Sequence, residues 1–345
     1  MSNNHVGIVG TGVYLPEGRM TAKEISEKTG GVWSEEAVRD KLGIVQKCMP
    51  QNNTTHGSQE MGALAALDCL KNTGVDPKKI DVILCMGEEW KEYPLTTSAL
   101  YIQDRIGAVN AWGIDVQNRC CTTVSAMKIA KDMLLADDEI NMIMVVGGYR
   151  NCDYVNYQDS NMSMMFDLGA GGGAILLQKN LGRNLLLGSH IIGDGSLARS
   201  AGVKYGGQVY PITKDNLEEA RTSLMLFEPE KMKDRLKEVS AANWATCIAE
   251  SLRRSGLKQS DLGYLASLHY KRSAYMAFLK DLGLTEDQSI YLENHGHIGQ
   301  VDQILSLHLA LEQGKVKDGT VLCMLAAGIG YVWAANIIKW GPASL

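Results

Sequence analysis

The second half of the chain repeats the pattern of the first half, and this duplication constrains the fold more than any other feature. The halves match at an offset of about 175 to 182 positions over most of their length. Residues 63–86 and 245–268 each read as a helix that stops at a glycine, Gly74 or Gly256, and leads into a short apolar strand. Because glycine is the usual residue at a left-handed helix end, the two segments share turn chemistry as well as pattern.

Further matches follow in the same order along both halves. They join 99–107 to 274–283, 114–118 to 290–294, 142–148 to 321–328, and 172–177 to 332–338. The strands 114–118 and 290–294 each run into a predicted helix, at 122–135 and 301–311. Short, nearly all-apolar strands between helices are typical of a mostly parallel sheet covered on both faces. We therefore predict an α/β protein whose halves, residues 1–180 and 181–345, are related by an approximate two-fold axis.

Composition narrows the classes of protein and partner. The chain has 345 residues, of which 45% are hydrophobic and 21% charged, and this balance favours a compact globular protein. Its 34 basic residues are dispersed among 39 acidic ones, so we expect neither nucleic acid nor membrane as a partner. Apolar runs fall short of the roughly 20 residues that a membrane span needs. Eight cysteines without a Cys-x-x-Cys pair predict a cytoplasmic protein with no metal site.

Candidate catalytic residues lie at the strand-to-helix turns. Cys120 stands where the helix 122–135 begins, and the partial positive charge of a helix N-terminus stabilises a thiolate. His297 occupies the equivalent turn of the second half, and His269 ends a strand. A thiolate facing two imidazoles suits acyl transfer, in which the histidines act as base or as donors to a developing oxyanion. Gly330, in a glycine-rich bend, is a candidate for an oxyanion-hole N–H.

Several motifs along the chain point to one known family. They are the opening 6–16 (VGIVGTGVYLP), Asp115 five residues before Cys120, 166–174 (FDLGAGGGA), 194–196 (DGS), Leu268-His269, and 328–333 (GIGYVW). Together they resemble the thiolase-fold condensing enzymes, most of all ketoacyl-acyl-carrier-protein synthase III, over nearly the whole chain. The resemblance implies duplicated αβαβα layered halves, a homodimer, Cys120 as nucleophile, and a coenzyme A thioester as substrate without a further cofactor.

The resemblance also suggests binding residues. It places Trp33 and Lys41 near the region that holds coenzyme A, and with Lys271 and Arg272 they could clamp its adenine and phosphates. The alternative is that these cations are solvated surface charges. It further implies that residues 92–100 lie at a two-fold interface, where Tyr93 would limit the acyl length in the partner's pocket; an exposed acidic loop is the alternative.

The chain departs from the type III pattern at three places. Where the family has H-G-N-T-S, residues 295–299 read HGHIG, so His297 replaces the usual asparagine. A Cys-His-His set resembles the elongating ketoacyl synthases instead. Residues 268–272 (LHYKR) interrupt the P-H-Q-A-N motif, and Thr122-Thr123 replace the usual small residues. Cys121 is a rival nucleophile, but the spacing from Asp115 favours Cys120.

The predicted reaction is a decarboxylative Claisen condensation. An acyl-CoA acylates Cys120, and malonyl-CoA or malonyl-acyl-carrier protein then enters. Neutral His269 and His297 hydrogen-bond its thioester oxygen as carbon dioxide leaves, and the product is a 3-oxoacyl thioester. One alternative is transfer without decarboxylation to an alcohol, an amine or a ketone acceptor, or a hydroxymethylglutaryl-type condensation. An alternative of another class is a non-catalytic subunit that binds acyl thioesters.

Overall fold

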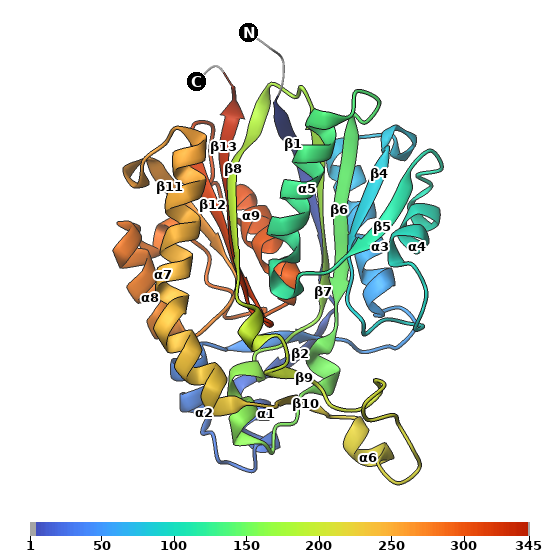
Figure 1. The fold of residues 1–345 in the computed structure, drawn as a ribbon, viewed down its shortest axis with the longest axis vertical. Helices are drawn as coiled ribbons and strands as arrows, with labels where there is room; N and C mark the ends of the chain where they lie inside the picture. The colour runs from blue at the N-terminus through green and yellow to red at the C-terminus, as the bar shows by residue number, and fades with distance from the viewer. Residues whose placement is uncertain (1–4, 344–345) are drawn as a thin grey trace.

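One mixed sheet forms the centre of the molecule. The structure, a computed structural model, describes residues 5–343. The nine strands of the large sheet lie in the order β11-β12-β13-β8-β1-β7-β6-β4-β5 (Figure 1). Their bounds are β1 Val6–Tyr14, β4 Val82–Met86, β5 Trp112–Val116, β6 Met142–Tyr149, β7 Gly171–Lys179, β8 Arg183–Gly193, β11 Leu262–Ser267, β12 Val321–Gly328 and β13 Val332–Pro342.

The strand order is repeated on the two sides of the centre, where β1 and β8 meet at one residue pair, Gly7 and Leu185. On one side β7, β6 and β4 follow β1, and on the other β13 and β12 follow β8, with β11 after β12. The expectation of a mostly parallel sheet was wrong. The pairs β4–β5, β4–β6 and β11–β12 are parallel, whereas β7 and β13 run antiparallel to their neighbours.

Helices cover the sheet, and two of them end at the glycines that the sequence predicts. The helices are α1 Ala22–Lys28, α2 Glu35–Ala37, α3 Ser58–Thr73, α4 Ser98–Ile106, α5 Thr122–Ala136, α6 Leu217–Ala220, α7 Pro229–Ser255, α8 Arg272–Leu282 and α9 Asp302–Glu312. Gly74 ends α3 with φ 66° and Gly256 ends α7 with φ 70°, the left-handed conformation that glycine adopts without strain. Apolar side chains of α5 and α9 share one core with those of the central strands.

One predicted strand, 290–294, does not form. Just before this segment, Ser289 makes one isolated bridge to Leu265 at the edge of the sheet. The backbone of this segment is bonded elsewhere, because the Glu293 carbonyl accepts from the N–H groups of Val45 and Gln46 at 2.8 and 3.1 Å. The segment is thus tied to the smaller strands below the sheet.

These smaller elements form a cap at the lower end of the sheet in Figure 1. The cap consists of α1, the pair β2 (Gly18–Thr21) and β3 (Gln46–Met49), and the pair β9 (Ala201–Val203) and β10 (Leu224–Leu226). A second core cluster joins cap residues such as Ile25 and Ile44 to Ile298 and Val301, which precede α9. The cap therefore packs directly over the turn that carries His297.

A buried lysine fastens the cap to the rest of the fold. The Lys47 Nζ on β3 donates to the Tyr157 hydroxyl and to the carbonyls of Phe166 and Leu168, each at 2.7 Å. Burial lowers the pKa of Lys47 from 10.5 to about 8, although Cys152 and Asp167 act in the opposite direction. Lys47 thereby fixes the loop that carries Asp167 against β3.

This pKa has a measurable consequence for stability. Between pH 8 and 10.5 the unfolded chain binds more protons at Lys47 than the folded chain, so the Lys47 contribution to the unfolding free energy rises with pH. We compare the unfolding free energies of wild type and Lys47→Met. From pH 7.5 to 10.5 the wild type should gain about 3 kcal/mol of unfolding free energy relative to the variant. Urea unfolding at a series of pH values measures it, and a pH-independent difference would contradict the shifted pKa.

Candidate active site

The predicted nucleophile lies in a tight turn between β5 and α5. Residues Arg119–Cys121 form a short 3-10 turn, and Cys120 is 9% exposed. The Thr122 hydroxyl accepts from the Asn118 N–H at 2.9 Å and donates to the Arg119 carbonyl at 2.5 Å, which closes the turn. Gly328, at the end of β12, packs so closely that a Cβ there would lie 3.2 Å from the Cys120 nitrogen. Cys120 therefore sits where the two halves meet.

His297 connects Cys120 to a buried carboxylate. Its Nε2 lies 3.1 Å from the Cys120 Sγ, and its Nδ1 lies 2.6 Å from Asp302 Oδ2. Asp302 is the fully buried first residue of α9 and also accepts from the N–H groups of Ile298 and His269, both at 2.7 Å. These bonds hold the carboxylate and, through it, the plane of the His297 ring.

The electrostatics of this group differ from the sequence-based expectation of a neutral His297. Burial alone favours the neutral imidazole, but the charges of Asp302 and Cys120 raise the pKa of His297 well above its usual 6.5. A protonated His297 can donate to the Cys120 sulfur while Asp302 balances its charge. The arrangement is that of a nucleophile, Cys120, a base, His297, and a carboxylate, Asp302, that orients the base.

His269 belongs to the same network but does not bond Cys120. Its Nδ1 lies 2.9 Å from Asp167 Oδ2, and its Nε2 lies 3.1 Å from the Gly43 carbonyl oxygen. Within residues 5–343, no hydrogen bond joins the His269 ring to the thiol. Two links join His269 to the Cys120–His297 pair: its backbone N–H donates to Asp302, and the carbonyl of Asp167 accepts from the His297 N–H at 2.8 Å. His269 must release the Gly43 carbonyl before its Nε2 can donate to a substrate oxygen.

Sequence reasoning missed the two carboxylates that orient the histidines. Asp302 stands at the start of a helix, where an acidic residue is expected for capping or dipole reasons alone. Asp167 lies within the FDLGAGGGA segment, which served only as a motif of the resemblance. The available signal was the short spacing of Asp302, five residues after His297, whereas Asp167 lies 102 residues before His269 in the chain.

Comparisons with known proteins point to one family and one fold. The family described as 3-oxoacyl-[acyl-carrier-protein] synthase III matches residues 114–195, and its C-terminal model matches residues 252–340. The chain is a ketoacyl synthase III-like enzyme of the thiolase fold. The β-ketoacyl-[acyl-carrier-protein] synthase III of Caldanaerobacter subterraneus subsp. tengcongensis is 24% identical over 336 residues, which cover 97% of each chain.

Solved structures share the fold. The 3-oxoacyl-[acyl-carrier-protein] synthase III of Aquifex aeolicus superposes with a TM-score of 0.82 at 19% identity, covering 97% of this chain and 100% of that one. The priming β-ketosynthase of the R1128 polyketide pathway gives a TM-score of 0.81 at 22% identity, covering 98% of this chain and 97% of that one. The predicted thiolase-like α/β fold is confirmed.

The residues predicted to hold coenzyme A are exposed or partly exposed. Trp33 lines a cavity of about 170 Å³ with Tyr157 and Phe166 among others. Lys41 and Lys271 are exposed. The Arg272 guanidinium is paired with the carboxylates of Glu286 and Glu293 at 2.7 and 3.2 Å, so its charge is already balanced within the protein. The segment 38–42, which holds Lys41, packs against α8, at whose start Lys271 and Arg272 lie, and the common role of the four residues stays a prediction.

The remaining predicted residues divide between the site and the surface. Gly330 lies in the turn between β12 and β13, but Gly328 is the glycine that contacts the Cys120 turn. Tyr93 is 72% exposed, and Leu95 beside it is fully exposed at φ 71°. Cys121 is fully buried with its thiol 3.3 Å from the Val332 carbonyl, and burial raises the pKa of Cys121 well above 9.0. Cys121 is therefore the poorer nucleophile.

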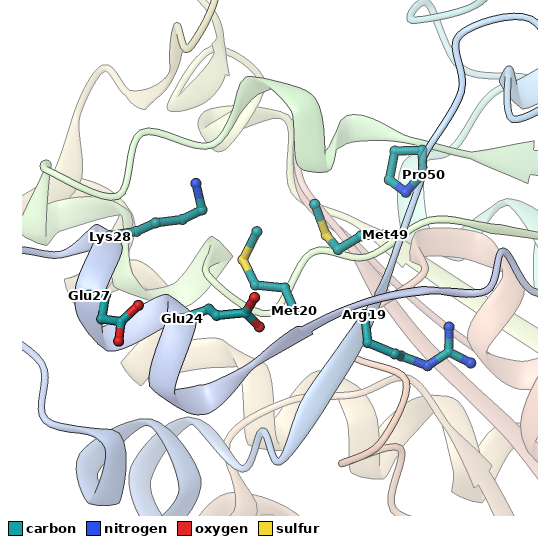
Figure 2. A pocket seen from close by; sticks show the side chains of 7 residues that line it. All are labelled: Arg19, Met20, Glu24, Glu27, Lys28, Met49 and Pro50. Carbon is teal, nitrogen blue, oxygen red and sulfur yellow. The ribbon is translucent and has the colours of Figure 1, made fainter.

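Another hollow lies away from the Cys120 group. A cavity of about 530 Å³ opens between α1 and the β2–β3 pair, with Met20 and Met49 at its centre and charged side chains around them (Figure 2). Its lining is Arg19, Met20, Glu24, Glu27, Lys28, Met49 and Pro50. Across residues 5–343, no cluster of three or more His, Cys, Asp or Glu side chains is arranged to hold a metal ion. No helix of that stretch is long and apolar enough to span a membrane.

Proposed function

We propose that the enzyme carries an acyl group on Cys120 between a coenzyme A thioester and a second substrate. The observation that carries this proposal is the chain of contacts from the Cys120 sulfur through His297 to Asp302. In the first step the Cys120 sulfur attacks the thioester carbonyl, and the new C–S bond forms as the coenzyme A thiolate leaves. The proton on His297 is available to that leaving thiolate.

For the second step we propose decarboxylative condensation with a malonyl-type thioester. The malonyl group loses carbon dioxide, the resulting enolate carbon attacks the acyl carbonyl, and Cys120 leaves as thiolate. After its proton has gone to the coenzyme A thiolate, His297 takes a new one from solvent and is then a strong donor to the enolate oxygen; His269 becomes a second donor once it leaves the Gly43 carbonyl. The names of the curated relatives, β-ketoacyl-[acyl-carrier-protein] synthases, support this acceptor class.

A second candidate is acyl transfer to an alcohol or an amine. The observation that favours it is the carboxylate behind His297, because a His–Asp pair can take a proton from a protic acceptor as it attacks. The asparagine of the type III pattern lacks that ability. The two candidates share the acyl-Cys120 intermediate and differ only in the acceptor.

Two measurements test the proposal in order. Intact-protein mass spectrometry with a panel of acyl-CoA donors should detect one acyl group per chain, on Cys120. Release of labelled carbon dioxide from malonyl-CoA or malonyl-acyl-carrier protein should then accompany loss of the adduct. An adduct without carbon dioxide release from any malonyl donor favours the protic acceptor. The absence of any adduct would contradict the acyl-enzyme itself and favour a silent binding subunit.

We also propose that the cytoplasmic enzyme is a homodimer, with its two layered halves divided near residue 180. The strand β5 ends the sheet, and its outward side chains Trp112 and Ile114 are about half exposed (Figure 1). The loop before α4 is fastened from inside, since Glu92 accepts from two N–H groups at the start of α3. Leu95 lies in this loop and is fully exposed, and a second copy of the chain would cover it together with the edge of β5.

The dimer can be tested by sedimentation. At micromolar concentration we expect a dimer for wild type and a monomer for Trp112→Lys/Ile114→Lys, because two lysines would place like charges at the pairing edge. Lysine substitution of Val109, which is exposed outside β5, serves as the control and should leave the dimer intact. A monomeric wild type would contradict the proposal.

A further inference from the structure

The residue before the nucleophile has an unfavourable backbone conformation. Arg119 has φ 51°, in the left-handed region that residues with a side chain rarely adopt. The segment therefore needs contacts that hold it, and such strain is often found beside reactive groups.

Two carboxylates hold the Arg119 side chain. Its Nη1 lies 3.5 Å from Glu88 Oε2, and its Nη2 lies 3.3 Å from Glu89 Oε1. The two acids differ in burial, because 3% of the Glu88 side chain is exposed and 73% of the Glu89 side chain. Among residues 5–343, Arg119 is the one cation paired with Glu88, whose other bond is from the Asn151 amide at 3.2 Å. Removal of the arginine would leave a buried, unpaired carboxylate.

The opposite side of the turn is closed by backbone. A Cβ built on Gly328 would lie 3.2 Å from the Arg119 Cβ and 2.8 Å from the Asn118 carbonyl oxygen. The Thr122 hydroxyl also bridges Asn118 and Arg119. The Arg119 backbone therefore has no room to relax toward β12, and the guanidinium fixes its other side.

We propose that Arg119 is a positioning residue for the nucleophile: buried Glu88 anchors its guanidinium, and the left-handed turn so maintained places the Cys120 sulfur against His297. The inference rests on the proposed role of Cys120 and adds two residues that do not touch the reacting atoms. Glu88 and Arg119 act through the turn geometry, whereas Glu89 contributes an exposed ion pair of little weight.

Four variants separate the effect of buried Glu88 from that of exposed Glu89 and test the backbone conformation at residue 119. Glu88→Gln keeps the size of the side chain and its acceptor for Asn151 but removes the charge that holds Arg119. Glu89→Gln is the matched control, since it removes an exposed partner of the same guanidinium. Two double variants, Glu88→Gln/Arg119→Gly and Glu88→Gln/Arg119→Ala, leave no buried unpaired charge. Of the two residues introduced, only glycine takes the left-handed conformation without strain.

The readout is alkylation of Cys120 by iodoacetamide at pH 7 and at pH 10, with peptide analysis to assign the site. At pH 7, Glu88→Gln should react about tenfold more slowly than wild type because the sulfur no longer meets His297, and Glu89→Gln should stay within about twofold. At pH 10, where thiols ionise without help, all variants should react alike. The glycine double variant should recover to within about threefold of wild type, and the alanine one should not.

A merely structural ion pair predicts a different result. Glu88→Gln would then lower the melting temperature but leave the pH 7 alkylation rate unchanged, and glycine would rescue nothing; either result overturns the proposal. Equal effects of Glu88→Gln and Glu89→Gln would also overturn it. Should no acyl-CoA acylate the wild type, the proposed function fails, yet the alkylation series still decides whether the anchor positions Cys120. The two failures are thus distinguishable.

Discussion

Cys120→Ala should abolish acyl transfer and leave the fold intact. The thiol supplies the atom that bonds the acyl group, so its removal should cost about 10⁴-fold or more in turnover, as loss of a nucleophile does. Its side chain lies in a turn held by Thr122 and Gly328, so we expect little change in melting temperature. Intact mass after incubation with an acyl-CoA and steady-state turnover measure the two effects.

Cys121→Ala is the matched control. Its thiol is fully buried beside Val332, so the substitution should act through packing alone, with a loss of unfolding free energy and a retained acyl adduct. An adduct that maps to Cys121 by peptide analysis would show that the family motif is misaligned by one residue.

The fold could be predicted because its signals are local and repeated. Glycine stops such as Gly74 and Gly256, and apolar strands such as 142–148, carry the information in adjacent residues. The strand expected at 290–294 has the same local signal, yet its backbone bonds to the cap through the Glu293 carbonyl. That choice depends on a tertiary partner more than 200 residues away, which periodicity does not report.

The site was predictable in part for the same reason. Cys120 and His297 stand at equivalent places in the two halves, each shortly before a helix, α5 or α9, and the structure brings them to 3.1 Å. The orientation of His269 depends on which acceptors its ring meets, here Asp167 and the Gly43 carbonyl, and neither is near it in sequence. Asp302 looks like an ordinary helix-start residue until its buried contacts are known.

His297 and Asp302 decide between the two acceptor classes. If condensation needs His297 only as a donor, His297→Ala should slow the step by about 10² to 10³ fold, whereas His297→Asn should keep much of the rate. If His297 is instead the base for an alcohol or an amine, asparagine takes no proton and should fail as badly as alanine. Because His297 also contacts the Cys120 sulfur, acylation must be timed separately, by the appearance of the adduct.

Asp302→Asn tests the role of His297 without changing His297 itself. Asparagine retains the size of the side chain but removes the charge that raises the pKa of His297, so a smaller fraction of the ring is protonated at a given pH and its basicity falls. A base role predicts a loss of about 10⁴-fold in transfer to a protic acceptor, the effect of the same change in a serine protease triad. A donor role predicts a loss confined to higher pH, because protonated His297 donates most strongly.

Carbon dioxide release from a labelled malonyl thioester, followed across pH for wild type, His297→Asn and Asp302→Asn, separates these outcomes. Release that is the same in both variants as in wild type would exclude the contacts of Cys120, His297 and Asp302 from the second step.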